Sequence, residues 1–94
     1  ELGDWDPGMR RMKFRPDIDL RGKRADEAME LVVDFIDEAI MVRARELRIL
    51  HGKGNGVLRQ LIREYLHTVD LVEWYGDEHV ERGGTGITLI RLDV

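Results

Sequence analysis

A chain of 94 residues without cysteine can form one domain with a modest core, but disulfides and thiolate metal sites cannot hold that domain together. No apolar run approaches the roughly 18 residues of a membrane-spanning helix and no signal peptide is visible, so we expect a cytoplasmic protein without a membrane partner. The net charge of −4 argues against a uniformly basic nucleic-acid-binding surface.

The charges are nevertheless segregated along the chain. Residues 10–24 contain seven basic residues against two acidic ones, and residues 43–63 contain six against one. Residues 26–40 carry six acidic residues and no basic one. This segregation predicts one basic and one acidic face, and a polyanion responds to the local field rather than to the net charge. Ordinary solvated surfaces are the alternative explanation.

The first part of the chain resembles a connection rather than a folded element. Residues 1–16 are polar and punctuated by glycine and proline, which is typical of a linker remnant or an N-terminal extension. The chain begins at Glu1 rather than Met, so we expect a domain taken from a longer protein. The folded domain is expected at residues 17–94.

Two short strands and a long helix are predicted at the start of the domain. Residues 12–14 alternate apolar with basic side chains and predict an edge strand. Residues 18–20 predict a second strand, which stops at Gly22. From residue 25 to 42 apolar side chains recur at helical spacing, with the acidic side chains on the opposite face.

The second half of the domain continues with a strand at 47–50, a helix at 57–66 and strands at 71–75 and 87–92. The order βαβαββ implies an α/β two-layer sandwich, in which two helices cover a mixed four-stranded sheet. The side chains expected in the core are Phe35, Ile36, Leu61 and Ile62, with at least one of Trp74 and Tyr75.

A glycine-rich turn, His51-Gly52-Lys53-Gly54-Asn55-Gly56, connects the strand at 47–50 to the second helix. Glycines let the backbone turn tightly and approach a ligand, and the N–H groups at the start of the helix favour an anion. Lys53 adds a positive charge, and a histidine can transfer protons near neutral pH. The turn therefore predicts a phosphate-handling site, without the Lys-Ser/Thr pair of a nucleotide triphosphatase loop. A histidine that only bonds to neighbouring backbone is the alternative.

Four short motifs together resemble the Smr (small MutS-related) domain family. They are Asp19-Leu20-Arg21-Gly22, Glu27-Ala28, the glycine-rich turn with Leu58-Arg59, and Gly83-Gly84-Thr85-Gly86-Ile87-Thr88. The resemblance extends from Ile18 to Leu92. Arg21, in place of the commoner histidine, resembles the version at the end of the second type of bacterial MutS homologue. The family fold resembles the C-terminal domain of translation initiation factor three, which agrees with the sandwich.

This resemblance implies nucleic-acid binding, often with nicking endonuclease activity on DNA or RNA, within a larger MutS-like protein of DNA recombination or repair. It makes Asp19 and His51 the candidate catalytic residues, expected together at one sheet edge. His51 would act as acid or base, and Asp19 would orient His51, activate a water or hold Mg²⁺ or Mn²⁺. The candidate nucleic-acid-binding residues are Arg21, Lys23, Gly52, Lys53, Gly54, Arg59, Arg63 and Gly84, the last through backbone amides.

Several features leave other functions open. Arg21 binds phosphate well but cannot transfer a proton, which favours a non-catalytic module for nucleic acid or stalled ribosomes. A protein-docking domain that uses the acidic helix is a third class. Asp19 could also cap the helix near residue 25 or pair with Arg21. His67 and His79 lack partners at metal-ligand spacing, so we expect no structural zinc.

The end of the first helix also departs from the family pattern. Arg43 stands where members of the resembled family often have glycine. A non-glycine residue in a left-handed helix cap costs on the order of 1 kcal/mol. We therefore expect this helix to end in a different way.

Overall fold

Four strands and two long helices follow one another in the order expected from the sequence. The computed structural model describes residues 13–94, so residues 1–12 of the expected linker and Met12 of the expected first strand lie outside it. The elements are β1 (Asp17–Asp19), α3 (Ala25–Val42), β2 (Glu46–Leu50), α4 (Val57–His67), β3 (Val72–Asp77), the 3₁₀ turns η1 (Val80–Arg82) and η2 (Gly84–Gly86), and β4 (Ile87–Leu92).

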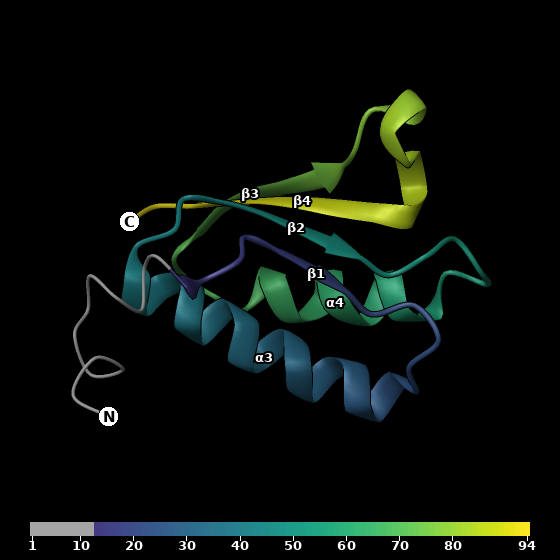
Figure 1. The fold of residues 1–94 in the computed structure, drawn as a ribbon, viewed down its shortest axis with the longest axis horizontal. Coiled ribbons are helices and arrows are strands. Elements are labelled where there is room, and N and C mark those ends of the chain that lie inside the picture. Colours follow the sequence, from purple (N-terminus) through teal and green to yellow (C-terminus); the bar gives the residue numbers. More distant parts are fainter. Residues whose placement is uncertain (1–12) are drawn as a thin grey trace.

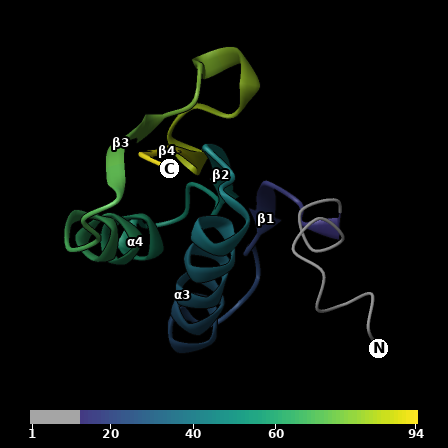
Figure 2. The same ribbon diagram turned by 90° about the vertical axis from the view of Figure 1, so that its left-hand side faces the viewer.

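The sheet has the strand order β1-β2-β4-β3. β1 runs parallel to β2, whereas β4 is antiparallel to both of its neighbours, so the sheet is mixed. Figures 1 and 2 show α3 and α4 on the same face of this sheet, while the connection through η1 and η2 rises on the opposite, open side. The expected α/β two-layer sandwich is confirmed. Within residues 13–94, neither helix is long and apolar enough to cross a membrane.

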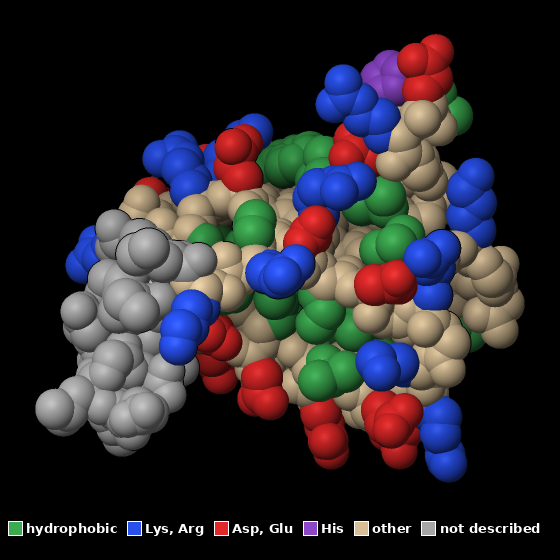
Figure 3. Space-filling model, in the orientation of Figure 1, with side chains coloured by type: hydrophobic (Ala, Val, Ile, Leu, Met, Phe, Trp, Pro, Cys, Tyr) green, Lys and Arg blue, Asp and Glu red, His purple; other side chains and the backbone are tan. Residues whose placement is uncertain are grey.

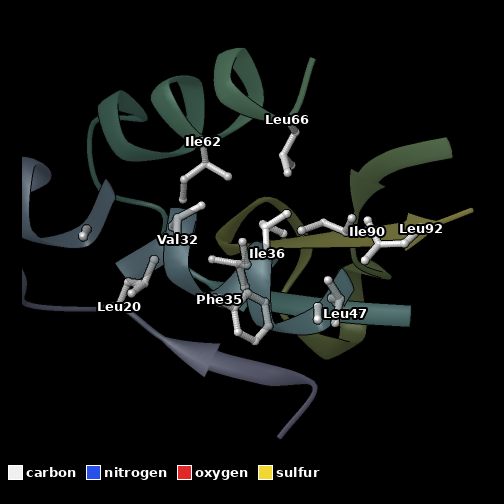
Figure 4. Packing of buried hydrophobic residues seen from close by; sticks show 12 residues of the cluster. Leu20, Val32, Phe35, Ile36, Leu47, Ile62, Leu66, Ile90 and Leu92 are labelled. Atoms are coloured by element: carbon white, nitrogen blue, oxygen red, sulfur yellow. The ribbon is translucent and has the colours of Figure 1, made fainter. Parts of the chain in front are cut away.

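The core lies between the sheet and the two helices, and strand alternation supplies half of it. On β2, Leu47 and Ile49 are buried while Arg48 between them is exposed. On α3 and α4 the buried side chains recur every three or four residues, which places them on one stripe. The labelled core residues in Figure 4 are Leu20, Val32, Phe35, Ile36, Leu47, Ile62, Leu66, Ile90 and Leu92, all of them buried.

Two details differ from the sequence expectations. Phe14 is not in a strand; its ring stacks on Phe35 at 5.6 Å between ring centroids, a contact that stabilises an aromatic pair. Leu61 is only half-buried, since Ile62 is the residue of this pair that faces the sheet. The expectation that at least one of Trp74 and Tyr75 lies in the core is confirmed, because Tyr75 packs against the core, while Trp74 is 43% exposed.

The end of α3 contradicts the expectation that a non-glycine residue would prevent a left-handed cap. Arg43 has φ 60° and ψ 40°, and it is the single non-glycine residue with positive φ between residues 13 and 94. Its N–H donates to the Ile40 carbonyl at 3.2 Å, and the Ala44 N–H donates to the Ala39 carbonyl at 2.9 Å. These bonds satisfy the last carbonyls of the helix, so the cap persists despite its backbone strain.

We expect the Arg43→Gly substitution to stabilise the domain by about 0.5–1 kcal/mol, because glycine adopts this left-handed conformation without a Cβ clash. Urea unfolding at neutral pH measures the difference. Arg43→Ala is the matched control, because alanine removes the same side chain but keeps the Cβ. An equal gain from alanine would show that the charge of Arg43, and not its backbone conformation, sets the stability.

Candidate nucleic-acid interface

The parallel pairing of β1 with β2 brings the two candidate catalytic residues to one edge of the sheet. Asp19 pairs with Leu50 in the register of these strands, and His51 follows Leu50 directly. Leu20 then donates its N–H to the Leu50 carbonyl at 2.8 Å. The expected placement at the carboxyl ends of adjacent parallel strands is therefore confirmed.

Asp19 forms an ion pair with Arg21 at this edge. The guanidinium Nε and Nη2 of Arg21 donate to the two carboxylate oxygens of Asp19 at 3.1 and 2.9 Å, and the Arg21 backbone N–H donates to Oδ1 at 3.0 Å. These bonds lower the pKa of Asp19, so its carboxylate is ionised at neutral pH. Of the two structural alternatives for Asp19, the pair with Arg21 is the one that forms.

The glycine-rich turn adopts the tight conformation that its sequence predicts. Gly52, Gly54 and Gly56 all have positive φ, a region that residues with a Cβ rarely enter. Asn55 accepts the Val57 N–H through its side-chain oxygen at 3.1 Å and so caps the start of α4. The turn also contacts Arg21, whose Cγ would lie 3.5 Å from a Cβ added at Gly52.

His51 is buried, with 7% of its surface exposed, and both of its ring nitrogens are within hydrogen-bond distance of a partner. Nδ1 lies 2.9 Å from the Gly52 carbonyl oxygen, which can only accept, so Nδ1 carries the proton. Nε2 then accepts from the Thr88 hydroxyl at 2.8 Å. Burial lowers the pKa of His51, and the nearby positive charge of Arg63 lowers it further. The imidazole is therefore neutral, and Asp19 does not orient it.

A chain of polar side chains continues from His51 to α4. The Thr88 hydroxyl accepts from Nε and Nη2 of Arg63 at 3.3 and 3.1 Å. Arg63 and Arg59 both donate to Oδ1 of Asp77, at 2.6 and 2.9 Å, and these bonds lower the pKa of Asp77. Both guanidinium groups thus bond to Asp77, and the expectation that Arg59 and Arg63 bind nucleic acid stays a prediction.

Sequence reasoning missed Thr88 and Asp77 as members of this network. Thr88 did carry a signal, since it is a polar residue in the apolar run of β4 and belongs to one of the four motifs. It is completely buried in the structure. Asp77 carried no signal, because an acidic residue in a polar segment is common and its partners are distant in sequence.

The segment at Gly83–Gly86 supports the turn through backbone hydrogen bonds. Gly84 is buried and donates its N–H to the His79 carbonyl at 3.1 Å. Its expected contact with nucleic acid stays a prediction. The Gly86 carbonyl accepts the N–H groups of His51 and Gly52 at 3.1 and 3.0 Å. A Cβ on Gly86 would lie 3.3 Å from Lys53 Cγ, so this close approach favours glycine.

The remaining cations at the edge are Lys53 and Lys23. Both are exposed, and neither has an ion pair among the side chains that the structure describes. Elsewhere within residues 13–94, arginines of one segment pair with acids of another, as Arg48 does with Glu78, so these residues do not form a separate basic face. Figure 3 shows basic and acidic side chains interspersed over the visible face, with many of the acids along its lower border.

The described residues do not fit a protein-held Mg²⁺ or Mn²⁺ ion. Between residues 13 and 94, no three His, Asp or Glu side chains are placed to share a metal ion. Both carboxylate oxygens of Asp19, the one metal ligand expected from the sequence, bond to Arg21. A divalent cation would have to arrive with the nucleic acid, since a hard cation prefers several oxygen ligands.

Comparison with known proteins identifies the family. A model of the Smr domain matches residues 18–93. The chain belongs to the Smr domain family. It is similar to endonuclease MutS2 of Symbiobacterium thermophilum, with 42% identity over 80 residues. That alignment covers 85% of this chain and 10% of the relative, so the chain spans about a tenth of the length of the curated relatives it matches.

Solved Smr structures have the same fold. The crystal structure of the Smr domain of Thermus thermophilus MutS2 aligns with a TM-score of 0.78 at 41% identity, covering 83% of this chain and 98% of that one. YdaL, a stand-alone small MutS-related protein from Escherichia coli, aligns with a TM-score of 0.79 at 25% identity, covering 84% and 65% respectively. The family and the fold expected from the four motifs are thus confirmed.

The buried neutral state of His51 predicts a pH dependence of stability. Since the native pKa lies below 6.5, the unfolded chain binds a proton first as the pH falls, and native stability decreases from about pH 6.5 down to the native pKa. Urea unfolding between about pH 7.5 and 5.5 measures this loss while the carboxylates stay ionised. We expect a smaller loss in His51→Gln, which cannot titrate. An unchanged loss in that variant would contradict the assignment.

Proposed function

We propose that this Smr domain binds the sugar-phosphate backbone of DNA or RNA at the edge formed by β1, β2 and the glycine-rich turn, and that it nicks the strand there. The observation that carries this proposal is the register of β1 with β2, which places the Asp19–Arg21 pair beside the turn that bears Lys53. The similarity to proteins named endonuclease MutS2 supports the reaction class. In this proposal the domain acts as part of a longer MutS-like chain.

Phosphodiester hydrolysis needs a base for the attacking water, positive charge near the phosphoryl oxygens and a proton for the leaving oxygen. In this proposal Arg21 turns from Asp19 to the phosphate, and the ionised carboxylate of Asp19 then takes the proton of the water. Arg21 and Lys53 stabilise the phosphoryl oxygens, and solvent protonates the leaving oxygen. His51 holds the turn in position, because proton transfer through Nε2 would first require breaking its bond to Thr88.

A second candidate function is a binding module without catalysis, which would present a larger protein to branched DNA or to RNA of a stalled ribosome. The observation that favours it is the engagement of both His51 ring nitrogens, together with Arg21 at the position of a second histidine. Backbone contacts alone do not distinguish DNA from RNA, because phosphates are common to both. The two candidates share the binding edge and differ only in whether a bond is broken.

The binding edge predicts that Lys53→Ala weakens binding to DNA and RNA of any sequence about equally. Loss of one phosphate contact should reduce the slope of log K against log salt by roughly one unit. Binding titrations at several salt concentrations measure this slope. Arg45→Ala is the matched control, because Arg45 precedes β2 at the opposite edge of the sheet and pairs with Glu73. An equal effect of both variants would indicate diffuse attraction instead of a site at the turn.

The nicking reaction predicts different effects for two carboxylates on one strand. Asp19→Asn should lower cleavage by about a hundredfold or more, with equal or tighter binding, because it removes a base and a negative charge beside phosphate. Asp17→Asn is the matched control for cleavage of bound strand, since Asp17 lies two residues earlier on the same face of β1 and its loss removes the same charge without removing the base. The assay uses DNA and RNA strands with and without Mg²⁺ or Mn²⁺.

The same assay separates the two candidate functions. Cleavage by Asp19→Asn at the unmutated rate would exclude Asp19 as the base. His51→Gln tests the remaining catalytic candidate, because glutamine can form both hydrogen bonds but cannot transfer the proton. No cleavage by the unmutated domain under any of these conditions would favour the binding module.

A further inference from the structure

The open face of the sheet carries an exposed tryptophan that the backbone-binding edge does not use. Trp74 lies on β3 opposite Arg91 of β4 and is 43% exposed. Its ring lies against Gly76, where an added Cβ would collide with the indole at 2.6 Å. The guanidinium of Arg91 lies 5.3 Å from the centre of the ring. The absence of a side chain at Gly76 leaves room for the indole on the sheet, and Arg91 lies close to it.

A hollow of about 360 Å³ lies beside this ring. Its apolar lining comes from Leu89, Pro16 and the indole of Trp74. Its polar lining includes Arg48 and Asp17. A second hollow, lined by Asp19, Ile87 and the same Arg48 and Asp17, continues from there toward the turn. The two hollows form one path over the open face, from the backbone-binding edge to Trp74.

We propose that the open face binds an unpaired base of the nucleic-acid strand held at the turn, with the base stacked beside Trp74 and Leu89. This inference rests on the proposed function, since it extends the same strand over the sheet. Base stacking on an exposed aromatic ring is a recurrent mode of single-strand recognition, and every base has the face it requires.

The charges of the hollow favour a base over a phosphate. Arg48 and Arg91 are balanced by Asp17 and Glu46 in its lining, so the site has no excess positive charge for an anion. A base, which is flat and neutral, would instead contact the apolar side chains of Trp74 and Leu89. The polar side chains around the hollow can form hydrogen bonds with the edges of that base. Phosphate contacts belong to the turn, where Lys53 is free of ion pairs among the described residues.

The separation of the two positions suits a short strand. Asp19 pairs with Leu50, whereas Trp74 pairs with Arg91, which pairs with Glu46. Leu50 and Glu46 are four residues apart on β2, which corresponds to about 13 Å along the strands at the usual rise per residue. Asp19 and Trp74 also lie on the two outermost strands, three strand spacings or about 14 Å apart across the sheet, so their separation is about 20 Å. About six stacked nucleotides span this length. A strand bound at the turn can therefore place a base at Trp74.

The test compares single and double strands on the complete 94-residue chain. Oligo-dT and oligo-U of about 12 nucleotides exceed the required span, and a duplex of equal length has no unpaired base. We expect Trp74→Ala to weaken single-strand binding about tenfold or more and Trp74→Phe to weaken it less, with duplex binding unchanged. Met41→Ala, an exposed apolar residue on α3, is the control substitution. Thermal unfolding checks that each variant is folded.

Each outcome decides the inference. Unchanged single-strand affinity in Trp74→Ala, with weaker binding in Lys53→Ala, overturns the stacking site but leaves the proposed function intact. No binding of any strand by the unmutated chain overturns the proposed function itself. In NMR spectra, the indole N–H signal that Trp74→Phe removes should shift when oligo-dT or oligo-U is added. A shift with protein concentration alone would instead assign this face to a second copy of the chain.

Discussion

The buried imidazole of His51 fixes the geometry of the whole carboxyl edge. Its Nδ1 holds the turn through Gly52, and its Nε2 holds the start of β4 through Thr88. Because the ring is desolvated, it can satisfy both partners only as one neutral tautomer. The turn, the Gly83–Gly86 segment and α4 consequently behave as one unit, to which Arg63 adds the last bond.

This arrangement separates the residues that build the edge from the residues that a ligand can reach. Arg59 and Arg63 share Asp77, which offsets one of their two positive charges. Lys53 projects from the turn itself and keeps its charge available. A domain with net negative charge can thus attract a polyanion locally, because a few unpaired cations beside exposed backbone outweigh distant acids.

Much of the fold followed from periodicity, whereas the polar network did not. The apolar stripe of α3 and the alternating burial of side chains on β2 follow from residues that are close together in the sequence. The sequence alone therefore predicts both elements. The partners of Arg63 could not be predicted in this way, because Asp77 and Thr88 reach it only after the sheet has formed. Tertiary packing also decided the environments of Phe14 and Leu61. The sequence could not predict that Phe14 stacks on a helix residue or that Leu61 is only half-buried.

The sequence motifs predicted where the candidate site residues lie better than they predicted the chemical role of each residue. The three glycines at positive φ and the joint placement of Asp19 and His51 could be expected from the sequence. The sequence does not show whether the ring nitrogens of a histidine are exposed. In this structure burial keeps the His51 imidazole neutral and both of its nitrogens bonded. Arg43 illustrates the converse, because two backbone hydrogen bonds maintain a cap that residue preference alone disfavours.

β1 has only three residues, yet it sets which way the carboxylate of Asp19 points. Adjacent side chains on a strand face opposite sides, so Asp19 remains on the open side only while Ile18 and Leu20 face the helices. A shift of this strand by one residue would bury the acid and expose two apolar side chains. Loss of an apolar neighbour that never contacts the nucleic acid could therefore have the same phenotype as loss of the acid itself.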